Sequence, residues 1–202
     1  MFTLDQLKLA MPTAGTRADL YYKPLMESME ACEINNCQRI TMYLSEIGHE
    51  SSDLLYMAEI WGPGQVPEQR TYAHRGGNDK AEALALVPTG IDPGKYFRGY
   101  GPMQVTFFDN QVKVADHFGI ARSDMVPWLQ TPEGGCKASA YFWMTHGLNE
   151  IADAENYDDI ANEFDAVCDI INIGHRTDRV GDSNGYRDRL ARYERVKLVL
   201  YA

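Results

Sequence analysis

The chain has 202 residues, of which 45% are hydrophobic, and 29 acidic against 19 basic side chains give it a formal charge of −10. This length can enclose one substantial hydrophobic core, so we expect a single domain spanning residues 1–202. The acidic balance argues against nucleic acid as a partner, because it provides no field to neutralise phosphates. The sequence contains no apolar run long enough to span a bilayer, so stable membrane insertion is not expected.

Helical periodicity, in which apolar side chains recur every three or four residues, marks seven segments of the chain. These segments are 4–11, 19–34, 37–61, 103–120, 131–153, 156–174 and 185–202. Thr3 is a candidate cap of the first segment, Pro24 is placed near a helix start in the second, and Asn35 or Asn36 can cap the third. Strand signals are sparse, so the predicted fold class is mainly α.

Residues 62–102 interrupt this helical pattern with a high density of glycine and proline. A connection this long inside a compact domain is usually functional or disordered, and its aromatic residues argue for order. We therefore expect a long irregular loop region that borders a cleft. Trp128 and Trp143 lie outside it and are interpreted as core residues, Trp143 because it stands in an apolar helical run.

The cysteines and the charges near the C-terminus give two further expectations. Neither C-x-x-C spacing nor the density of a disulfide scaffold is present, so the cysteines are interpreted as buried free thiols, with a disulfide as the alternative. They are Cys32, Cys37, Cys136 and Cys168. Residues 175–202 carry seven basic and four acidic side chains, a local charge of +3 that we hypothesise to form a docking face for an anionic polymer.

The segment GHESSDLLYMAEIWGP, residues 48–63, carries two glutamates nine positions apart. On a helical wheel, Glu50 lies about 70° from the centre of the apolar stripe and Glu46 about 110°. Glu50 is thus expected at the edge of the buried face, where partial desolvation favours the protonated form that a proton donor needs. In a straight helix, Glu59 would lie on the opposite side, roughly 13 Å further along the axis.

The two carboxyl groups can face each other only if this helix is interrupted. Ser51, Ser52 and Asp53 favour an interruption, because their side chains compete for backbone hydrogen bonds. Two carboxyl groups about 6.5–9.5 Å apart would suit an inverting glycosidase. On spacing alone, two solvated surface charges remain the simpler interpretation. The zinc motif H-E-x-x-H is disfavoured because position 53 is aspartate, so no metal site is predicted.

Further along the chain, GHES and AEIWGP are followed in order by YFRGYGPMQVT, IINIGH and RDRLARY. This ordered set resembles glycoside hydrolase family 19, the chitinase-like fold, and is most similar to its phage endolysin branch, over about residues 4–199. The resemblance implies a lysozyme-like, two-lobed helical fold that forms a single catalytic domain, with no separate wall-binding module. It implies no cofactor.

The resemblance also implies roles for individual residues. Glu50 matches the general acid, Glu59 the general base that activates water, and Thr106 a position that holds this water. Further matched positions bind substrate or pair with the catalytic acids: Gln104, Asn110, Asn172 and Arg189. We expect an arginine near Glu59 to keep that residue ionised.

Four of these residues also have a structural alternative. Gln104 and Thr106 can serve a helix N-terminus, Asn172 can cap a helix before Gly174, and Arg189 can form a surface salt bridge. Departures from the family pattern leave the acids in place but affect the expected sugar subsites: Tyr100, Pro102, Met103, Phe107, Ile173 and His175. Four aromatic residues in or beside the long loop are candidate stacking surfaces for sugar rings: Trp61, Tyr72, Tyr96 and Tyr100.

Together these features favour a monomeric peptidoglycan hydrolase that cleaves β-1,4 bonds by general acid/base catalysis, with inversion. The start MFTLDQLKLAMP lacks the features of a signal peptide, so we expect synthesis in the host cytoplasm and, from the resemblance, release to the cell wall through a holin-type membrane hole. A chitinase acting on N-acetylglucosamine polymers is the first alternative. A catalytically inactive wall-binding protein on the same fold is the second.

Overall fold

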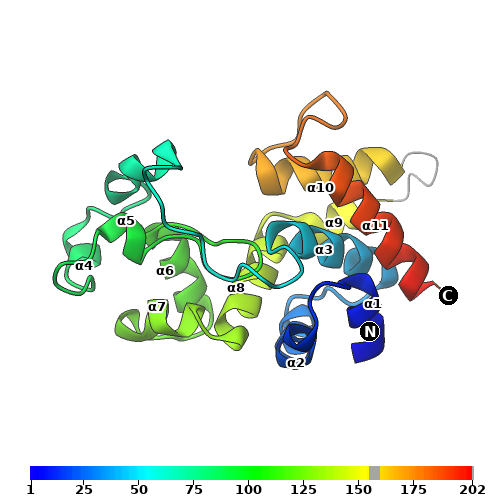
Figure 1. Ribbon diagram of the computed structural model, residues 1–202, viewed down its shortest axis with the longest axis horizontal. Helices are drawn as coiled ribbons and strands as arrows, with labels where there is room; N and C mark the ends of the chain where they lie inside the picture. Colours follow the sequence, from blue (N-terminus) through cyan, green and yellow to red (C-terminus); the bar gives the residue numbers. More distant parts are fainter. Residues whose placement is uncertain (155–159, 202) are drawn as a thin grey trace.

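The computed structural model describes residues 1–154 and 160–201 and contains two hydrophobic cores. Seven helices surround the larger core: α1 (Leu4–Ala10), α2 (Thr16–Ala31), α3 (Cys37–Glu50), α8 (Pro132–Thr145), α9 (Leu148–Ala152), α10 (Ile160–Asn172) and α11 (Tyr186–Leu200). The smaller core lies among α4 (Ala81–Leu84), α5 (Pro93–Tyr96), α6 (Phe108–His117) and α7 (Arg122–Leu129), with the 3₁₀ helix η1 (Pro67–His74) beside α5. Figure 1 shows the two lobes, with α8 between them.

This arrangement confirms the prediction of a mainly helical, two-lobed fold. Strand pairing in the described residues is limited to isolated bridges that join Ala58 to Tyr100 and Tyr100 to Val105. Two predicted caps are also confirmed. The Thr3 hydroxyl accepts from the Gln6 amide at 3.2 Å in a capping box, and the Asn36 side chain accepts from the amide of Arg39 at 2.9 Å.

The prediction that Pro24 lies near a helix start is wrong, because α2 begins at Thr16 and continues through this proline. A proline inside a helix removes one backbone hydrogen bond. Packing offsets that loss, since Tyr21, Leu25 and Met29 are buried in the larger core, where α2 packs against α8.

Other predicted boundaries also change. Residues 62–102 are not irregular throughout, because they contain η1, α4 and α5, and α7 lies where no helix was predicted. The segment 131–153 is divided at Gly147, which has a φ of +67°. For the segment 156–174, α10 is seen from Ile160 onward; residues 156–159, like residue 202 of the last segment, lie outside the described part of the chain.

Trp143 is fully buried, as predicted, and its indole N–H donates to Asn149 at 2.8 Å, whereas Trp128 is half-buried against the smaller core. All four cysteines are free thiols, and three of them are buried: Cys32, Cys136 and Cys168. The expectation of burial is wrong for Cys37, which begins α3 and is exposed. No helix among the described residues is long and apolar enough to cross a membrane.

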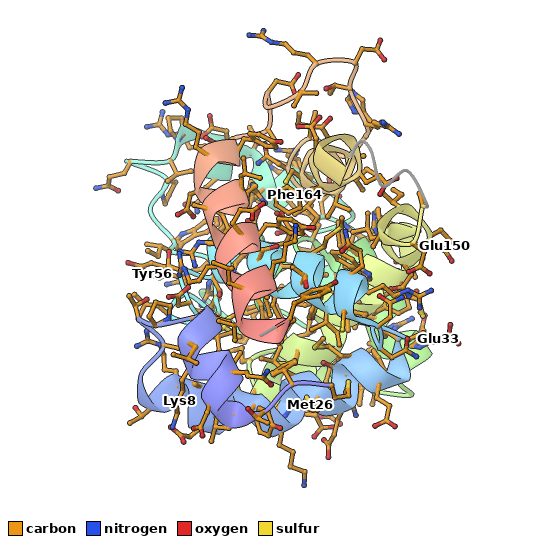
Figure 2. All side chains as sticks on the ribbon, turned by 90° about the vertical axis from the view of Figure 1, so that its right-hand side faces the viewer. Lys8, Met26, Glu33, Tyr56, Glu150 and Phe164 are labelled. Atoms are coloured by element: carbon orange, nitrogen blue, oxygen red, sulfur yellow. The ribbon has the colours of Figure 1, made fainter. Side chains whose placement is uncertain are left out.

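The C-terminal helix α11 packs along α3 and lies on the side of the molecule away from the smaller lobe (Figure 1). Phe164 of α10, labelled in Figure 2, lies beside this helix. Its ring lies 6.3 and 4.6 Å between centroids from the rings of Tyr186 and Tyr193 of α11. Two arginines of α11 point inward: Arg189 is buried, and Arg192 pairs with Asp53 and Asp188. These two charges are therefore not available to the basic docking face that was hypothesised for residues 175–202.

Candidate active site

Helix α3 ends at Glu50, and the chain turns sharply immediately after it. The Ser51 hydroxyl donates to the carbonyl of Ile47 at 2.5 Å and accepts from the amide of Leu54 at 2.8 Å, so it replaces helical hydrogen bonds. Ser52, Asp53 and Leu54 then take φ values of +49°, +54° and +62°. Three consecutive non-glycine residues in this region are costly and persist only where the surroundings hold them. The predicted interruption between the two glutamates is confirmed.

Asp53 holds this turn in place. One of its carboxylate oxygens accepts from the amide of Thr13 at 3.1 Å and from its hydroxyl at 2.6 Å, and the other pairs with Arg192. The Asp53 side chain is buried, and its partners Thr13 and Arg192 are partly open to solvent. The aspartate at position 53 therefore has a structural function.

Glu50 contacts a buried arginine. The guanidinium of Arg189, whose side chain is 1% exposed, binds Glu50 through one terminal nitrogen and Glu46 through the other. Its Nε donates to the carbonyl of Asn184 at 3.1 Å. The alternative of a surface salt bridge is therefore wrong for Arg189, while Glu50 remains 23% exposed and accessible.

Glu46 is the more deeply buried of the two glutamates on this guanidinium, with no exposed side-chain area. Burial raises the pKa of Glu46 to about 7, although Arg189 and the thiol of Cys168, which donates at 3.3 Å, both act to lower it. Glu46 and Glu50 share one cation, and within this unit the buried Glu46 can hold a proton near neutral pH. A proton held beside Glu50 fits the proton-donating end of an acid/base pair.

The position of Glu46 corrects the helical-wheel estimate, which placed it further from the buried face than Glu50. All residues from Ile40 to Gly48 are buried, because α3 is covered on several sides by α9, α10 and α11. A single apolar stripe describes a surface helix, whereas α3 is a central one.

Glu59 has a different environment. Its carboxylate accepts from Gln69 at 2.8 Å, from the hydroxyl of Tyr72 at 3.2 Å and from the amide of Gly99 at 3.1 Å. All three donors are neutral, and this is the bonding pattern of an ionised carboxylate, which only accepts. Burial, followed by the charge of Glu59, raises the pKa of Tyr72 and keeps its hydroxyl a donor. The expectation that an arginine would support Glu59 is wrong for Arg189, which contacts Glu46 and Glu50 instead.

Backbone pairing places Glu59 beside the QVT segment, residues 104–106. The amide of Glu59 donates to the carbonyl of Gly99 at 2.8 Å, and Tyr100 pairs in turn with Val105. Gly99 leaves no room for a side chain, because a Cβ there would lie 2.9 Å from Gln104 Oε1 and 3.0 Å from Thr106 Oγ1. The polar atoms of Gln104 and Thr106 therefore lie next to the residue that binds the Glu59 carboxylate.

Thr106 is held by its neighbours without capping a helix. Its hydroxyl donates to the carbonyl of Gln104 at 2.7 Å, and its own carbonyl accepts from Asn110 at 3.1 Å. Helix α6 has Phe107 at its N-cap and no side-chain cap, so the alternative in which Gln104 or Thr106 caps this helix is not observed. Gln104 and Phe107 have φ values of +53° and +74°, and such strain in non-glycine residues is typical of ligand sites.

The aromatic candidates separate into two groups. Trp61 and Tyr72 lie 6.0 Å apart between centroids beside Glu59, and the ring of Phe107 packs on Tyr72 at 4.9 Å. Tyr96, in contrast, is half-buried against the core of the smaller lobe, 4.9 Å from the ring of Phe97, and its carbonyl accepts from the buried Tyr100. The structure therefore brings Trp61 and Tyr72 to the site and places Tyr96 and Tyr100 in the packing of the smaller lobe.

Asn172 ends α10, and its side-chain oxygen accepts from the amide of Asn184 at 2.7 Å. Its side chain therefore reaches the loop before α11 and does not cap its own helix. Because the carbonyl of Asn184 accepts from Arg189, Asn172 is joined through this loop to the guanidinium that binds Glu50.

Three residues of this arrangement were not found from the sequence. Gln69 is buried and bonds both Glu59 and the backbone of the loop, and it lies in a segment without a distinguishing pattern. Gly99 stands in a stretch rich in glycine, so its particular steric role is not visible there. Glu46 had a usable signal, since it lies one helical turn before Glu50 and therefore on the same side of the helix.

Two helical lobes, one around each hydrophobic core, define a fold of the lysozyme type. Among solved structures the chain has the fold of family 19 chitinases. Chitinase C from Streptomyces griseus HUT6037 aligns with a TM-score of 0.68 and 16% identity over 99% of this chain and 76% of its own. A bacterial family 19 chitinase aligns with a TM-score of 0.62 and 18% identity, over 98% of this chain and 94% of its own. No protein-family model matches the sequence, and no curated protein does so either.

Proposed function

We propose that this protein is a glycoside hydrolase that cleaves β-1,4 bonds in an N-acetylated glycan by general acid/base catalysis. The observation that carries the proposal is the contrast between the two glutamates: Glu50 shares the Arg189 guanidinium with Glu46, which can retain a proton, and Glu59 accepts hydrogen bonds from three neutral donors. Two carboxyl groups in opposed environments are the arrangement that acid/base catalysis requires.

In the proposed mechanism, Glu50 protonates the glycosidic oxygen as the bond to the anomeric carbon breaks. Glu59 takes a proton from a water molecule that is oriented together with Thr106, and the water oxygen attacks the anomeric carbon from the opposite face. The product would have inverted configuration. Gln104 and Asn110 would bind the sugar beside this water, with Trp61 and Tyr72 as the apolar wall.

We propose peptidoglycan as the substrate, in keeping with the similarity of the ordered motifs to phage endolysins. The enzyme would then act as a monomer that reaches the cell wall after holin-type release. Chitin is the second candidate, because the similar solved structures are chitinases.

Turnover of purified cell walls and of chitin oligomers, followed by mass spectrometry of the products, tests this proposal. We expect wall fragments with newly formed reducing ends, and we expect Glu50→Gln and Glu59→Gln each to lower the rate by about a hundredfold to ten thousandfold. Glu30→Gln, which changes an exposed glutamate of α2, is the matched control and should retain full activity. Wall binding without turnover of either substrate would instead support the inactive wall-binding alternative.

A further inference from the structure

A groove of about 450 Å³ leads away from the QVT segment between α6 and α8. It begins at the candidate site residues Gln104, Thr106 and Asn110 and ends at Ile171, the neighbour of Asn172. A ligand in this groove would therefore extend from the residues beside Glu59, the candidate base, toward the loop whose backbone accepts a hydrogen bond from Arg189. The part of the groove beyond Asn110 contains no residue of the proposed mechanism.

The charge of this groove is opposite to that of the protein as a whole. The chain carries a formal charge of −10, yet none of the described residues that line the groove is acidic. Its lining includes one lysine, Lys113, which is exposed on α6. Acidic side chains in the lining would repel an anionic ligand. Because the described lining has none, a basic side chain there can attract such a ligand.

Lys113 is available to a ligand because the acids of α6 are paired with other cations. Asp109 binds Lys80 at 2.6 Å, and Asp116 binds Arg122 at 2.7 Å. Within the described part of the chain, no carboxylate lies within ion-pair distance of Lys113. A cation without an internal partner, at the wall of a groove, can pair with a charge that the ligand supplies.

The opposite wall carries a histidine in a defined orientation. The ring of His146 stacks on Phe142 with 3.9 Å between centroids and 25° between planes. Its Nδ1 lies 2.8 Å from the carbonyl of Phe142, so Nδ1 carries the proton and donates. This bond leaves Nε2 for a ligand, as an acceptor in the neutral ring and as a donor to an anion in the protonated ring.

We propose that this groove recognises a sugar that bears a carboxylate, with Lys113 and His146 as specificity-determining residues on its two walls. In the glycan of the proposed function, on which this inference rests, a muramic acid unit that carries no peptide has a free lactyl carboxylate next to apolar methyl groups. Lys113 pairs with this carboxylate, and the apolar surface of Tyr141, Phe142 and Ile171 contacts the methyl groups. Chitin has no such charge, so the groove favours peptidoglycan strands whose muramic acid units lack peptides.

Binding to three glycans tests this inference with the full-length protein. The first is a peptidoglycan strand freed of its peptides, which exposes the lactyl carboxylates; the second is the same strand after methyl esterification; the third is a chitin oligomer of equal length. We expect the unmodified protein to prefer the first strand by about threefold to tenfold at low salt, with the preference decreasing as salt is added. Lys113→Gln should abolish the preference and leave binding to the esterified strand unchanged, and His146→Gln should reduce it.

The control is Lys95→Gln, which removes the same charge from an exposed position on α5 outside the groove lining and should preserve the preference. Equal binding of the charged and esterified strands by the unmodified protein, or no binding to either, would overturn the inference. An equal loss of affinity for the charged and the esterified strand in Lys113→Gln would also overturn it, since the lysine would then contribute to binding without distinguishing the two. A protein that shows the charge preference but cleaves nothing would support the groove assignment and refute the hydrolase proposal, so the two failures are distinguishable.

Discussion

Glu46→Gln tests whether the carboxyl groups around Arg189 hold a proton in the folded protein. The substitution keeps the shape of a side chain that has no exposed area and removes its ability to ionise. Burial raises the pKa of Glu46 from 4.5 to about 7. The folded protein therefore retains a proton that the unfolded chain releases above about pH 4.5.

The sign and size of the effect follow from this difference. Below pH 4.5 both states hold the proton, and the contribution of Glu46 to stability is fully present. As the pH rises toward 7, the unfolded chain loses the proton first, so the free energy of unfolding falls by up to about 1.4 kcal/mol per pH unit and by about 3 kcal/mol in all. Above pH 7 both states are ionised, and this contribution changes no further.

Urea unfolding at pH values from 4 to 8 measures this effect as the difference between the variant and the unmodified protein. We expect Glu46→Gln to gain about 3 kcal/mol relative to the unmodified protein between pH 4.5 and 7, whatever its constant offset at low pH. Glu30→Gln, at an exposed position, should show no such trend. A pH-independent difference for Glu46→Gln would show that Glu46 ionises as it does in the unfolded chain, and the proton-holding unit would be refuted.

Two further substitutions separate positioning from stability. Gly99→Ala should lower the free energy of unfolding by about 1–3 kcal/mol and lower kcat against cell walls, because the new Cβ must displace Gln104 and Thr106. An unchanged kcat would remove Thr106 from the proposed mechanism. Asp53→Asn keeps a residue type that tolerates the positive φ but removes the charge that Arg192 pairs with, so we expect thermal unfolding to show a loss of about 1.5–3 kcal/mol. An unaltered melting temperature would show that this ion pair does not hold the turn.

The part of the site that local chemistry determines could be predicted from the sequence. The start of the interruption after Glu50 is of this kind, because the Ser51 hydroxyl accepts from the amide of Leu54, three residues away. The caps at Thr3 and Asn36 are similar, since the partner lies three residues away in each case. These bonds need no knowledge of the tertiary fold, whereas the bonds of Asp53 to Thr13 and Arg192, which hold the turn, depend on it.

The part of the site that depends on packing between distant segments could not be predicted from the sequence. Glu46 is buried because α11 covers its side of α3, and the wheel of α3 alone places it toward solvent. Tyr96 lies in a segment predicted to be an irregular loop, yet it ends α5 and packs against a second core that the sequence does not reveal. Pro24 is tolerated inside α2 because tertiary burial outweighs one lost hydrogen bond. In each case a long-range contact overrides the local preference.

The two halves of the candidate site differ in how closely they are tied to global stability. Arg189 reaches Glu46 and Glu50 across 143 and 139 positions of sequence, and both Arg189 and Glu46 are buried. Loss of one partner leaves a buried charge uncompensated, which is strongly destabilising, so substitutions on the acid side should lower activity and stability together. On the base side, the hydroxyl of Thr106 bonds only two residues back along the chain, at Gln104. Conservative changes there can therefore remove a positioned group while the fold remains intact, and the separation of kcat from melting temperature should be clearest at Thr106.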